Sequence, residues 1–551
     1  MTTKLKIALI VDDERVWNRH VYELAEWAKS TDCLDVSHLI IQERLWPRDD
    51  IFPTLLSGRP IRALTLALWK AINKLESIDA ARIDPHVGRR TTYDLGKIVP
   101  GKIRVKPLVS KSGFVHHFSA QDLDSIRQEQ FDLLIRCGKG ILKGGILTSA
   151  RLGIVSFHHG DNRVIRGGPP GFWEVYYRQP RTGFIAQRLT EELDGGAVIM
   201  RGYIPTQETQ ALNRTVLFTK SYHHLRTLLL QIGRTGQLPE AEAPIPFCGR
   251  LMVAPTLLQQ MLYICRSVSR SVATRVRRVF RYDEHWGICF AKTHWRGAVL
   301  WRGAQIRTPA NRFLADPFVA TWNGRTCVFA EDFTSRRRKA RISAFEIADR
   351  SARELGVALE EDFHLSFPYL FSFDGRLFMC PESYEGKEIR IYECVEFPLK
   401  WKLAVVAMKN VRAADSMIFQ KNDLWWMLTN ITRTEPRAYC TELYLFWAST
   451  PLTGEWQPHP RNPILTDPLT ARNGGLLRDG AEIIRVGQCQ GFRSYGDAAS
   501  LFRIARISKE EYTEELISRI TPDFMRAIHG THHFHSDGVY SVWDFKKWAR
   551  A

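Results

Sequence analysis

The chain has 551 residues, 44% of them hydrophobic and 25% charged, and its formal net charge at pH 7 is +18. This composition is that of a folded protein rather than a disordered one, and the length predicts two to four domains. No apolar run approaches the roughly 18 residues that a membrane-spanning helix needs. The ten cysteines form no C-x-x-C pair, so we expect no metal site, no disulfide framework and a cytoplasmic location. The positive charge favours an anionic partner: nucleic acid, a nucleotide-linked small molecule or a membrane surface.

The first part of the chain, residues 1–235, alternates short apolar runs with stretches of helical period. The runs "KIALIVDD", "VSHLIIQE", "FDLLIRCG" and "GIVSFHH" are typical of buried strands in a parallel sheet. Between them, "VYELAEWAKS", "IRALTLALWKAINKLE" and "AQDLDSIRQEQ" repeat apolar residues as helices do. This order predicts a Rossmann-like α/β domain that binds its ligand at the carboxyl ends of the strands. Gly138 and His158 end two of the runs, so we expect both at that edge.

Residues 236–284 differ in composition from what precedes them. Four prolines between residues 239 and 255 indicate a linker, and the run "CRSVSRSVATRVRRVFR" indicates a basic helix. We interpret this helix as a solvated connection between two domains. Contact with phosphate or with a membrane surface is the alternative.

From residue 285 to residue 551 the helical period nearly disappears, and a turn dipeptide followed by a strand recurs. These dipeptides begin at Asn323, Asp374, Asn422, Asp479 and Asp537. Asn-Gly and Asp-Gly before a strand are strong hairpin signals, and a repeat of about 50 residues in an all-β segment is typical of propeller blades. We predict a five-bladed β-propeller, closed by pairing of strands from the two ends of the domain.

The register of this repeat predicts a polar channel. Asp316, Phe367, Asp415 and Arg472 occupy equivalent positions before successive turns, and Glu331 and Glu382 occupy equivalent positions after them. In a propeller the first strand of each blade lines the central channel. We therefore expect a channel that binds a polyhydroxylated ligand, with a lining that includes Asp316, Glu331, Glu382, Asp415 and Arg472. The alternative is that these polar residues only cap turns.

Residues 131–206 resemble the folate-dependent formyltransferases of methionyl-tRNA and of amino sugars. "FDLLIRCGKGIL" looks like the strand and folate-side loop of that family. "GIVSFHHGDNRVIRGGPPGFWEV" looks like its Asn-x-His strand end with the following loop, and "TGFIAQRLTEELDGGAVIMRGYIPT" like its Leu-Asp-x-Gly turn. The resemblance implies 10-formyltetrahydrofolate as the formyl donor and a loop of Gly138, Gly140, Ile141 and Leu142 that binds it.

The same resemblance assigns expected roles to side chains. His158 would take a proton from the attacking amine. Asp194 would orient His158 and stabilise its imidazolium, or would pass protons to the leaving folate nitrogen. Ser156 stands where the family has its catalytic Asn, and a hydroxyl is shorter than an amide. We expect the loop after His158 to contact substrate through His159, Asp161, Arg163, Arg166, Gly167 and Trp173, although Trp173 is equally an anchor for packing.

The second half resembles the propeller fused to plant glucosamine inositolphosphorylceramide transferases, on the segments "FLADPFVATWNGRTCVFAED", "HLSFPYLFSFDGRLFMCPES", "RAADSMIFQKNDLWWM" and "ARNGGLLRDGAEIIRVGQCQ". That fold is similar to the glycosidase propellers of arabinanases and fructosidases, which use axial carboxylates as base and acid. Asp316 looks like the base position, with Glu382 and Asp415 as candidates for the others. A full triad is not matched, and Arg472 favours an anionic ligand.

These resemblances imply a formyltransferase that acts on an amino sugar, most simply a nucleotide-linked one, with a propeller that binds saccharide. An alternative is a glycoside hydrolase or glycan-binding propeller with a degenerate first domain. A third interpretation, formylation of an aminoacyl-tRNA, fits the basic charge, but a propeller replaces the barrel with which that family grips tRNA.

Overall fold

The computed structural model describes residues 4–43, 60–89, 91–111, 113–192, 195–246, 249–280, 282–308, 311–334, 338–432 and 441–550. The chain divides into two compact units, Met1–Ser267 and Val268–Ala551. The division falls within the segment predicted to connect two domains. Each unit is described by itself below.

The first unit contains a seven-stranded sheet. Its order is β13-β12-β10-β8-β1-β3-β5, made of β1 (Leu5–Val11), β3 (Leu34–Gln42), β5 (Gly101–Val105), β8 (Leu133–Arg136), β10 (Ile154–His158), β12 (Arg181–Arg188) and β13 (Ala197–Pro205). The five strands from β10 to β5 run parallel, and β12 and β13 are antiparallel to their neighbours. The apolar runs of the sequence are thus the parallel strands, which confirms the α/β prediction.

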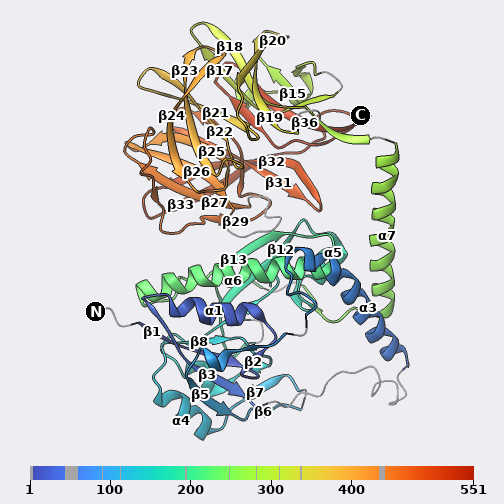
Figure 1. Cartoon of the computed structure of the whole chain (residues 1–551), viewed down its shortest axis with the longest axis vertical. Coiled ribbons are helices and arrows are strands. Elements are labelled where there is room, and N and C mark those ends of the chain that lie inside the picture. The colour runs from blue at the N-terminus through green and yellow to red at the C-terminus, as the bar shows by residue number, and fades with distance from the viewer. Residues whose placement is uncertain are drawn as a thin grey trace. The chain divides into compact units, whose positions relative to one another are not determined.

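Helices cover both faces of this sheet (Figure 1). Helices α1 (Arg19–Lys29) and α6 (Gln210–Thr235) pack their apolar residues on one face, where Leu24 and Leu229 join Leu9 in one core cluster. Helix α4 (Ala120–Gln128) packs Ile126 on the opposite face against Ala8 and neighbouring strands. Helix α3 (Pro60–Ile83) contacts α6, and the short α5 (Phe172–Tyr177) follows the loop after β10.

Part of the predicted linker forms hydrogen bonds and ion pairs with the first unit. The Glu242 amide donates to the Val198 carbonyl at 2.8 Å, and the Glu242 carboxylate binds Arg201 and Arg163. Helix α7 (Leu257–Val279) contains the basic run as far as Val279 but begins before it, directly after Pro255 and Thr256. Among the described residues, no helix is long and apolar enough to cross a membrane.

The second unit consists of five antiparallel sheets, which confirms the five-bladed propeller. Four of them follow chain order: β17 to β20 (residues 312–359), β21 to β24 (366–409), β25 to β29 (413–466) and β30 to β33 (472–520). The fifth combines β15 (Tyr282–Ala291) and β16 (Ala304–Gln305) with β34 (Ile528–Gly530), β35 (Phe534–Ser536) and β36 (Ser541–Arg550). β15 pairs with β36 along its whole length, from Tyr282↔Arg550 to Ala291↔Ser541.

The innermost strands form a closed ring. β17 (Arg312–Trp322) contacts β21 (Ser366–Phe373), and contacts continue through β25 (Ala413–Lys421), β30 (Arg472–Asp479) and β35 back to β17. The five predicted turn dipeptides lie at the ends of these five strands. Both residues of the Asn323-Gly324 turn have positive φ, 49° and 76°, the conformation that an Asn-Gly hairpin turn adopts.

Candidate functional site

Two predicted loops meet at the carboxyl edge of the parallel sheet. β8 leads into the turn of Gly138 and Gly140, and β10 ends at His158. The Lys139 amide donates to Asp12 Oδ1 at 2.9 Å, which attaches this turn to the end of β1. Only a glycine fits at position 140, where φ is +87° and a Cβ atom would lie 2.4 Å from the His116 ring. His116 in turn bonds Gln42, at the end of β3, through Nδ1 at 2.8 Å.

The segment that follows the glycine turn contacts the segment that resembles the Leu-Asp-x-Gly turn. The Gly144 amide donates to Glu191 Oε1 at 2.9 Å, and Ile141 and Leu142 form β9 between these two points. Asp194, the residue predicted to orient His158, lies outside the described residues. The structure therefore brings together the neighbourhoods of the predicted folate loop and of the predicted acid.

Both hydrogen-bonding functions of the Ser156 hydroxyl, which stands where the family has its Asn, are used within the protein. Ser156 is 2% exposed, and its Oγ accepts from Arg136 Nη1 at 3.2 Å and donates to the Phe157 carbonyl at 3.3 Å. Arg136 also donates to the Gly140 carbonyl. A guanidinium thus supports both the strand end and the glycine turn. The sequence analysis did not select Arg136. Its position as a charged residue at the end of a buried apolar run could have indicated a role at the strand end.

The two adjacent histidines have different surroundings. His159 stacks on Phe218 of α6, with ring centroids 3.9 Å apart and planes 4° apart. Burial, together with the neighbouring His158 and His20, lowers the pKa of His159 to about 3. His159 is therefore a neutral, packed ring, whereas His158 is the histidine of the strand edge next to Ser156.

The rest of the predicted substrate loop is strongly anchored. The buried Asp161 carboxylate accepts from Arg201, from the Tyr203 hydroxyl at 2.8 Å and from the Arg163 amide at 3.0 Å. Arg163 itself pairs with Glu242 at 2.8 Å. These contacts attach the loop to β13 and to the linker.

The loop continues into a short strand and a buried aromatic helix. Arg166 and Gly167 pair with Leu251 and Met252, and Trp173 is buried, its Nε1 donating to the Gly168 carbonyl at 3.1 Å. For Trp173 the structure favours the packing alternative. Next to Trp173, burial raises the pKa of Glu174 to about 7, and the sequence did not single out this carboxyl group.

A cationic cavity of about 320 Å³ lies beside this edge. Its lining includes three arginines, Arg19, Arg89 and Arg214, against one aspartate, Asp84. Arg19 pairs with Asp84 at 2.9 Å, which leaves an excess of positive charge. Phe218 lines the cavity and stacks on His159, so the cavity adjoins the end of β10.

In the propeller, the predicted channel residues gather at the start of the innermost strands. Asp316 and Asp415 adopt the same left-handed conformation, each with φ of 50°, at equivalent β-bulges. Arg472 Nε donates to Asp415 Oδ2 at 2.7 Å, and Arg472 Nη2 lies 3.6 Å from Glu382 Oε2. The repeat register thus brings four of the five predicted residues together.

Carboxylates crowd this end of the channel. Burial raises the pKa of Asp316, His532 opposes this effect and the charges of Glu331, Asp415 and Asp544 add to it; the net result is a pKa of about 8. Burial and Asp415 hold the pKa of Glu382 well above its usual range. Glu331, the fifth predicted residue, lies 3.2 Å from His364 Nε2 and acts on Asp316 through its charge. Since like charges this close cannot all ionise, the cluster holds protons at neutral pH.

The fifth blade adds residues that the sequence analysis did not select. Asp544 binds His532 Nδ1 and accepts the His532 and His533 amides, and His532 Nε2 lies 3.3 Å from Asp316 Oδ1. Trp286 covers His532, with ring centroids 4.2 Å apart. Ligand atoms of Asp316, His532 and Asp544 all lie within 4.8 Å of one another, a spacing that suits a cation. The sequence predicted no metal because no cysteine spacing suggested one; the cluster "THHFH" before a turn was the signal available.

In comparisons with known proteins, the two units of the chain match different relatives. A family model described as "Glucosamine inositolphosphorylceramide transferase 1, N-terminal" matches residues 302–535. The chain is 37% identical over 212 residues to glucosamine inositolphosphorylceramide transferase 1 of Arabidopsis thaliana, which covers 37% of this chain and 27% of that protein. It is also 29% identical over 90 residues to methionyl-tRNA formyltransferase of Gloeothece citriformis (strain PCC 7424), covering 16% of this chain and 27% of that protein.

Among solved structures, the family 117 glycoside hydrolase Zg3597 of Zobellia galactanivorans matches with a TM-score of 0.31 and 11% identity, over 48% of this chain and 90% of that chain. The chain spans about a quarter of the length of the curated relatives it matches. Both resemblances seen in the sequence are confirmed: a formyltransferase-like α/β unit precedes a propeller similar to the N-terminal domain of the plant transferases.

Proposed function

We propose that the α/β unit transfers a formyl group from 10-formyltetrahydrofolate to the amine of an amino sugar, and that the propeller channel binds saccharide. The observation that carries the proposal is the meeting of two segments at the carboxyl edge of the sheet: the glycine turn after β8 and the His158 end of β10, which Arg136 joins through the Gly140 carbonyl and the Ser156 hydroxyl. The segment that follows the glycine turn also bonds Glu191, in the stretch that resembles the Leu-Asp-x-Gly turn. Scattered reduced cysteines support a cytoplasmic location.

The residues at this edge fit a polar, planar donor. Positions 138 and 140 of the turn, on either side of Lys139, carry no side chain. Arg136 Nε is a buried donor with no hydrogen-bond partner among the described residues. When bound, 10-formyltetrahydrofolate supplies the formyl carbon. His158 would accept the proton that the amine loses as its nitrogen bonds to that carbon, and would pass this proton to the folate nitrogen as the carbon–nitrogen bond to the folate breaks. Arg136, bonded to Ser156, would supply a cation for the negative charge that develops on the formyl oxygen.

The cavity of Arg19, Arg89 and Arg214 supports an anionic acceptor. Arginine forms bidentate hydrogen bonds with phosphate, and a cavity of about 320 Å³ has room for a phosphorylated sugar rather than for a large macromolecular surface. A nucleotide-linked amino sugar provides both the phosphates and the amine. The name of the Arabidopsis relative, a transferase of glucosamine, also supports a sugar-related substrate.

The crowded carboxylates support a second candidate function for the propeller. Glu382 keeps a proton beside Asp415, because burial and that neighbour raise its pKa. Glycoside hydrolysis uses a pair of carboxyl groups, one of which carries a proton as the general acid. Arg472 bridges both groups, which favours the binding of saccharide over its hydrolysis.

The transfer is tested by incubating the full chain with 10-formyltetrahydrofolate and UDP-glucosamine, followed by mass spectrometry of the sugar. We expect an N-formylated product from the wild type and from His159→Phe, which keeps the stacked ring, and none from His158→Ala. Equal product from His158→Ala would overturn the role of His158. Failure of calorimetry to detect folate binding would overturn the use of this donor.

A further inference from the structure

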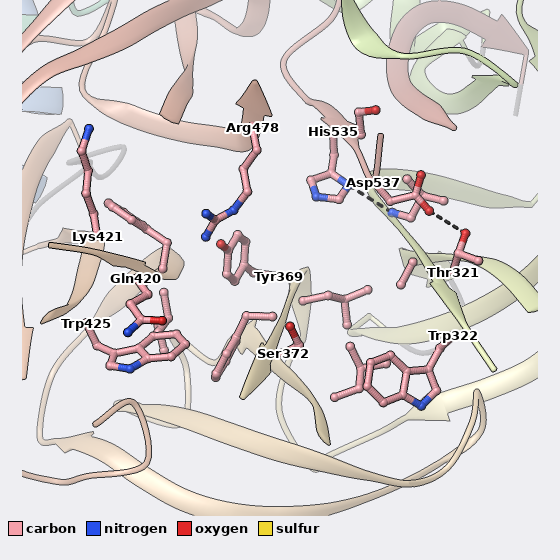
Figure 2. Close-up of a pocket in the computed structure, with 18 of the residues that line it drawn as sticks. Thr321, Trp322, Tyr369, Ser372, Gln420, Lys421, Trp425, Arg478, His535 and Asp537 are labelled. Carbon is pink, nitrogen blue, oxygen red and sulfur yellow. Dashed lines mark hydrogen bonds between the residues drawn. The ribbon is translucent and has the colours of Figure 1, made fainter. Parts of the chain in front are cut away.

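A second cavity opens at the opposite end of the propeller channel, where the innermost strands reach their turns. Its volume is about 780 Å³. All five innermost strands contribute to its wall, through Val319 to Trp322 of β17, Tyr369 to Ser372 of β21, Ile418 to Lys421 of β25, Arg478 of β30 and His535 of β35 (Figure 2). Asp316 lies five residues before Thr321 on β17, and the regular part of the strand between them, from Phe318 to Thr321, alone spans about 10 Å at about 3.3 Å per residue.

A layer of buried rings closes the channel between the two ends. Phe318 contacts Phe367 at 4.9 Å and His533 at 4.5 Å between ring centroids, and all three side chains are fully buried. The His535 ring lies between this layer and the cavity, and its centroid is 4.8 Å from that of Phe318. A ligand in the cavity therefore cannot reach the carboxylates around Asp316.

One side of the cavity is cationic and aromatic. Arg478 and Lys421 line it, and among the described residues neither side chain has an ion pair or a hydrogen bond. In Figure 2 the Arg478 guanidinium lies beside Tyr369, and the Lys421 ammonium lies farther out. Tyr369 and Trp425 lie on the same side in Figure 2, and the charge of Arg478 acts on Tyr369. Tyr369 and Trp425 are 4% and 6% exposed, so a sugar ring would meet only a small part of each aromatic side chain. Two cations beside these side chains suit an anionic group attached to that ring.

The other side carries hydrogen-bonding groups that are already oriented. Asp537 accepts from the Thr321 hydroxyl at 2.7 Å and from the Val539 and Tyr540 amides. His535 Nδ1 accepts from the Val319 amide at 3.3 Å, so Nε2 carries the ring proton and is a donor. Figure 2 shows Trp322 on this side as well. A fixed carboxylate, a hydroxyl and an imidazole N–H suit the hydroxyl groups of a saccharide.

We propose that this cavity is a second binding site, specific for a saccharide that carries a phosphate or a carboxylate. The anionic group binds Arg478 and Lys421, the ring packs on Tyr369 and Trp425, and the hydroxyl groups face Asp537 and His535. This inference does not rest on formyl transfer or on the channel carboxylates, since the ring layer separates the two ends.

The test is isothermal titration calorimetry of the full chain with glucose 1-phosphate, glucuronate and glucose. We expect binding of at least one anionic sugar, and affinity for glucose at least about tenfold lower, since a charge-assisted hydrogen bond contributes about 1.5–3 kcal/mol. Preference for the phosphate or for the carboxylate identifies the anionic group. No binding of either anionic sugar, or equal binding of glucose, would overturn the proposal.

Variants locate the binding to this cavity. Arg478→Gln is expected to weaken binding of the anionic sugar about tenfold, and Trp322→Leu, on the opposite wall, to weaken it without removing the preference for charge. Arg461→Gln, at an exposed arginine outside the cavity, is the matched control and should bind as the wild type does. Asp316→Asn and His158→Ala should also bind normally; loss of binding in Asp316→Asn would assign the ligand to the other end of the channel.

Discussion

Arg136 on β8 donates a hydrogen bond to the hydroxyl of Ser156 on β10, 3.2 Å away across neighbouring parallel strands. The same guanidinium holds the carbonyl of Gly140. One cation therefore links the strand end next to His158 with the turn that we assign to the folate donor. The two halves of the candidate site depend on this contact.

Replacing Ser156 by Ala should leave the buried Arg136 guanidinium without its hydrogen-bond partner on β10. We expect the free energy of unfolding of the α/β unit to fall by about 1–3 kcal/mol, the usual cost of an unsatisfied buried polar group. Urea denaturation measures the change. Ser156→Thr, which keeps the hydroxyl, is the control, and an unchanged stability in Ser156→Ala would show that Arg136 finds another partner.

Gly140→Ala should damage the predicted folate loop. A Cβ atom at this position would meet the His116 ring at 2.4 Å, whereas at Gly113 it would meet no atom within 4 Å, and both residues have positive φ, +87° and +79°. Both variants therefore carry similar backbone strain, but only Gly140→Ala displaces His116. We expect Gly140→Ala to lose folate binding in calorimetry and Gly113→Ala to retain it. Equal affinities would exclude this turn from the folate site.

Asp161→Asn should destabilise the α/β unit. Its carboxylate pairs with Arg201, and the two side chains are 8% and 9% exposed. Breaking a buried ion pair by removing one charge costs about 3–5 kcal/mol, although Glu242 retains part of the Arg201 interaction. Chemical denaturation of Asp161→Asn and of Tyr203→Phe, which removes only a neutral hydrogen bond, checks the difference. A smaller loss in Asp161→Asn than in Tyr203→Phe would contradict it.

His159→Phe should reduce the sensitivity of the α/β unit to acid. The pKa of His159 is lowered to about 3 in the fold, from an ordinary value of 6.5. Below pH 6.5 the unfolded chain therefore takes up a proton that the folded chain excludes, and stability is lost as pH falls toward 3. Phenylalanine keeps the stacking on Phe218 without titrating. Denaturation at pH 7 and pH 5 should show a smaller loss for the variant; equal losses would mean that His159 is not the group responsible.

Asp316→Asn should reduce the loss of propeller stability at rising pH, whereas the His159 variant reduces a loss at falling pH. The pKa of Asp316 is raised from 3.8 to about 8, so the folded chain holds a proton that the unfolded chain releases. Stability is lost as pH rises from about 4 to 8, and an amide avoids this loss. Relative to wild type, Asp316→Asn should therefore gain stability between pH 5 and pH 8. Asp374→Asn, at an exposed turn, is the control and should show no such trend.

Local patterns predicted most of this architecture, because apolar runs and turn dipeptides act over a few residues. The run from Ile7 to Val11 is a buried central strand, and the turn at Asn323 ends an innermost strand of the propeller. The repeat register brought Asp316 and Asp415 to equivalent bulges. Contacts between distant segments were not visible in the sequence. The partnership of Arg136 with Ser156, and of His532 with Asp316, depends on which strands become neighbours, and no pattern within one segment encodes it.

The pairing of β15 with β36 has a consequence for how the protein is made. Each of the four other blades can form once its own strands have left the ribosome, whereas the blade that contains β15 remains incomplete until Ser541–Arg550 has been synthesised. Until then β15 presents unpaired backbone groups, which are prone to bind other strands. Closure by strands so far apart in the chain is also slow. The nascent propeller is thus most vulnerable to aggregation until Ser541–Arg550 has been synthesised, and a chaperone that shields Tyr282–Ala291 would act before that point.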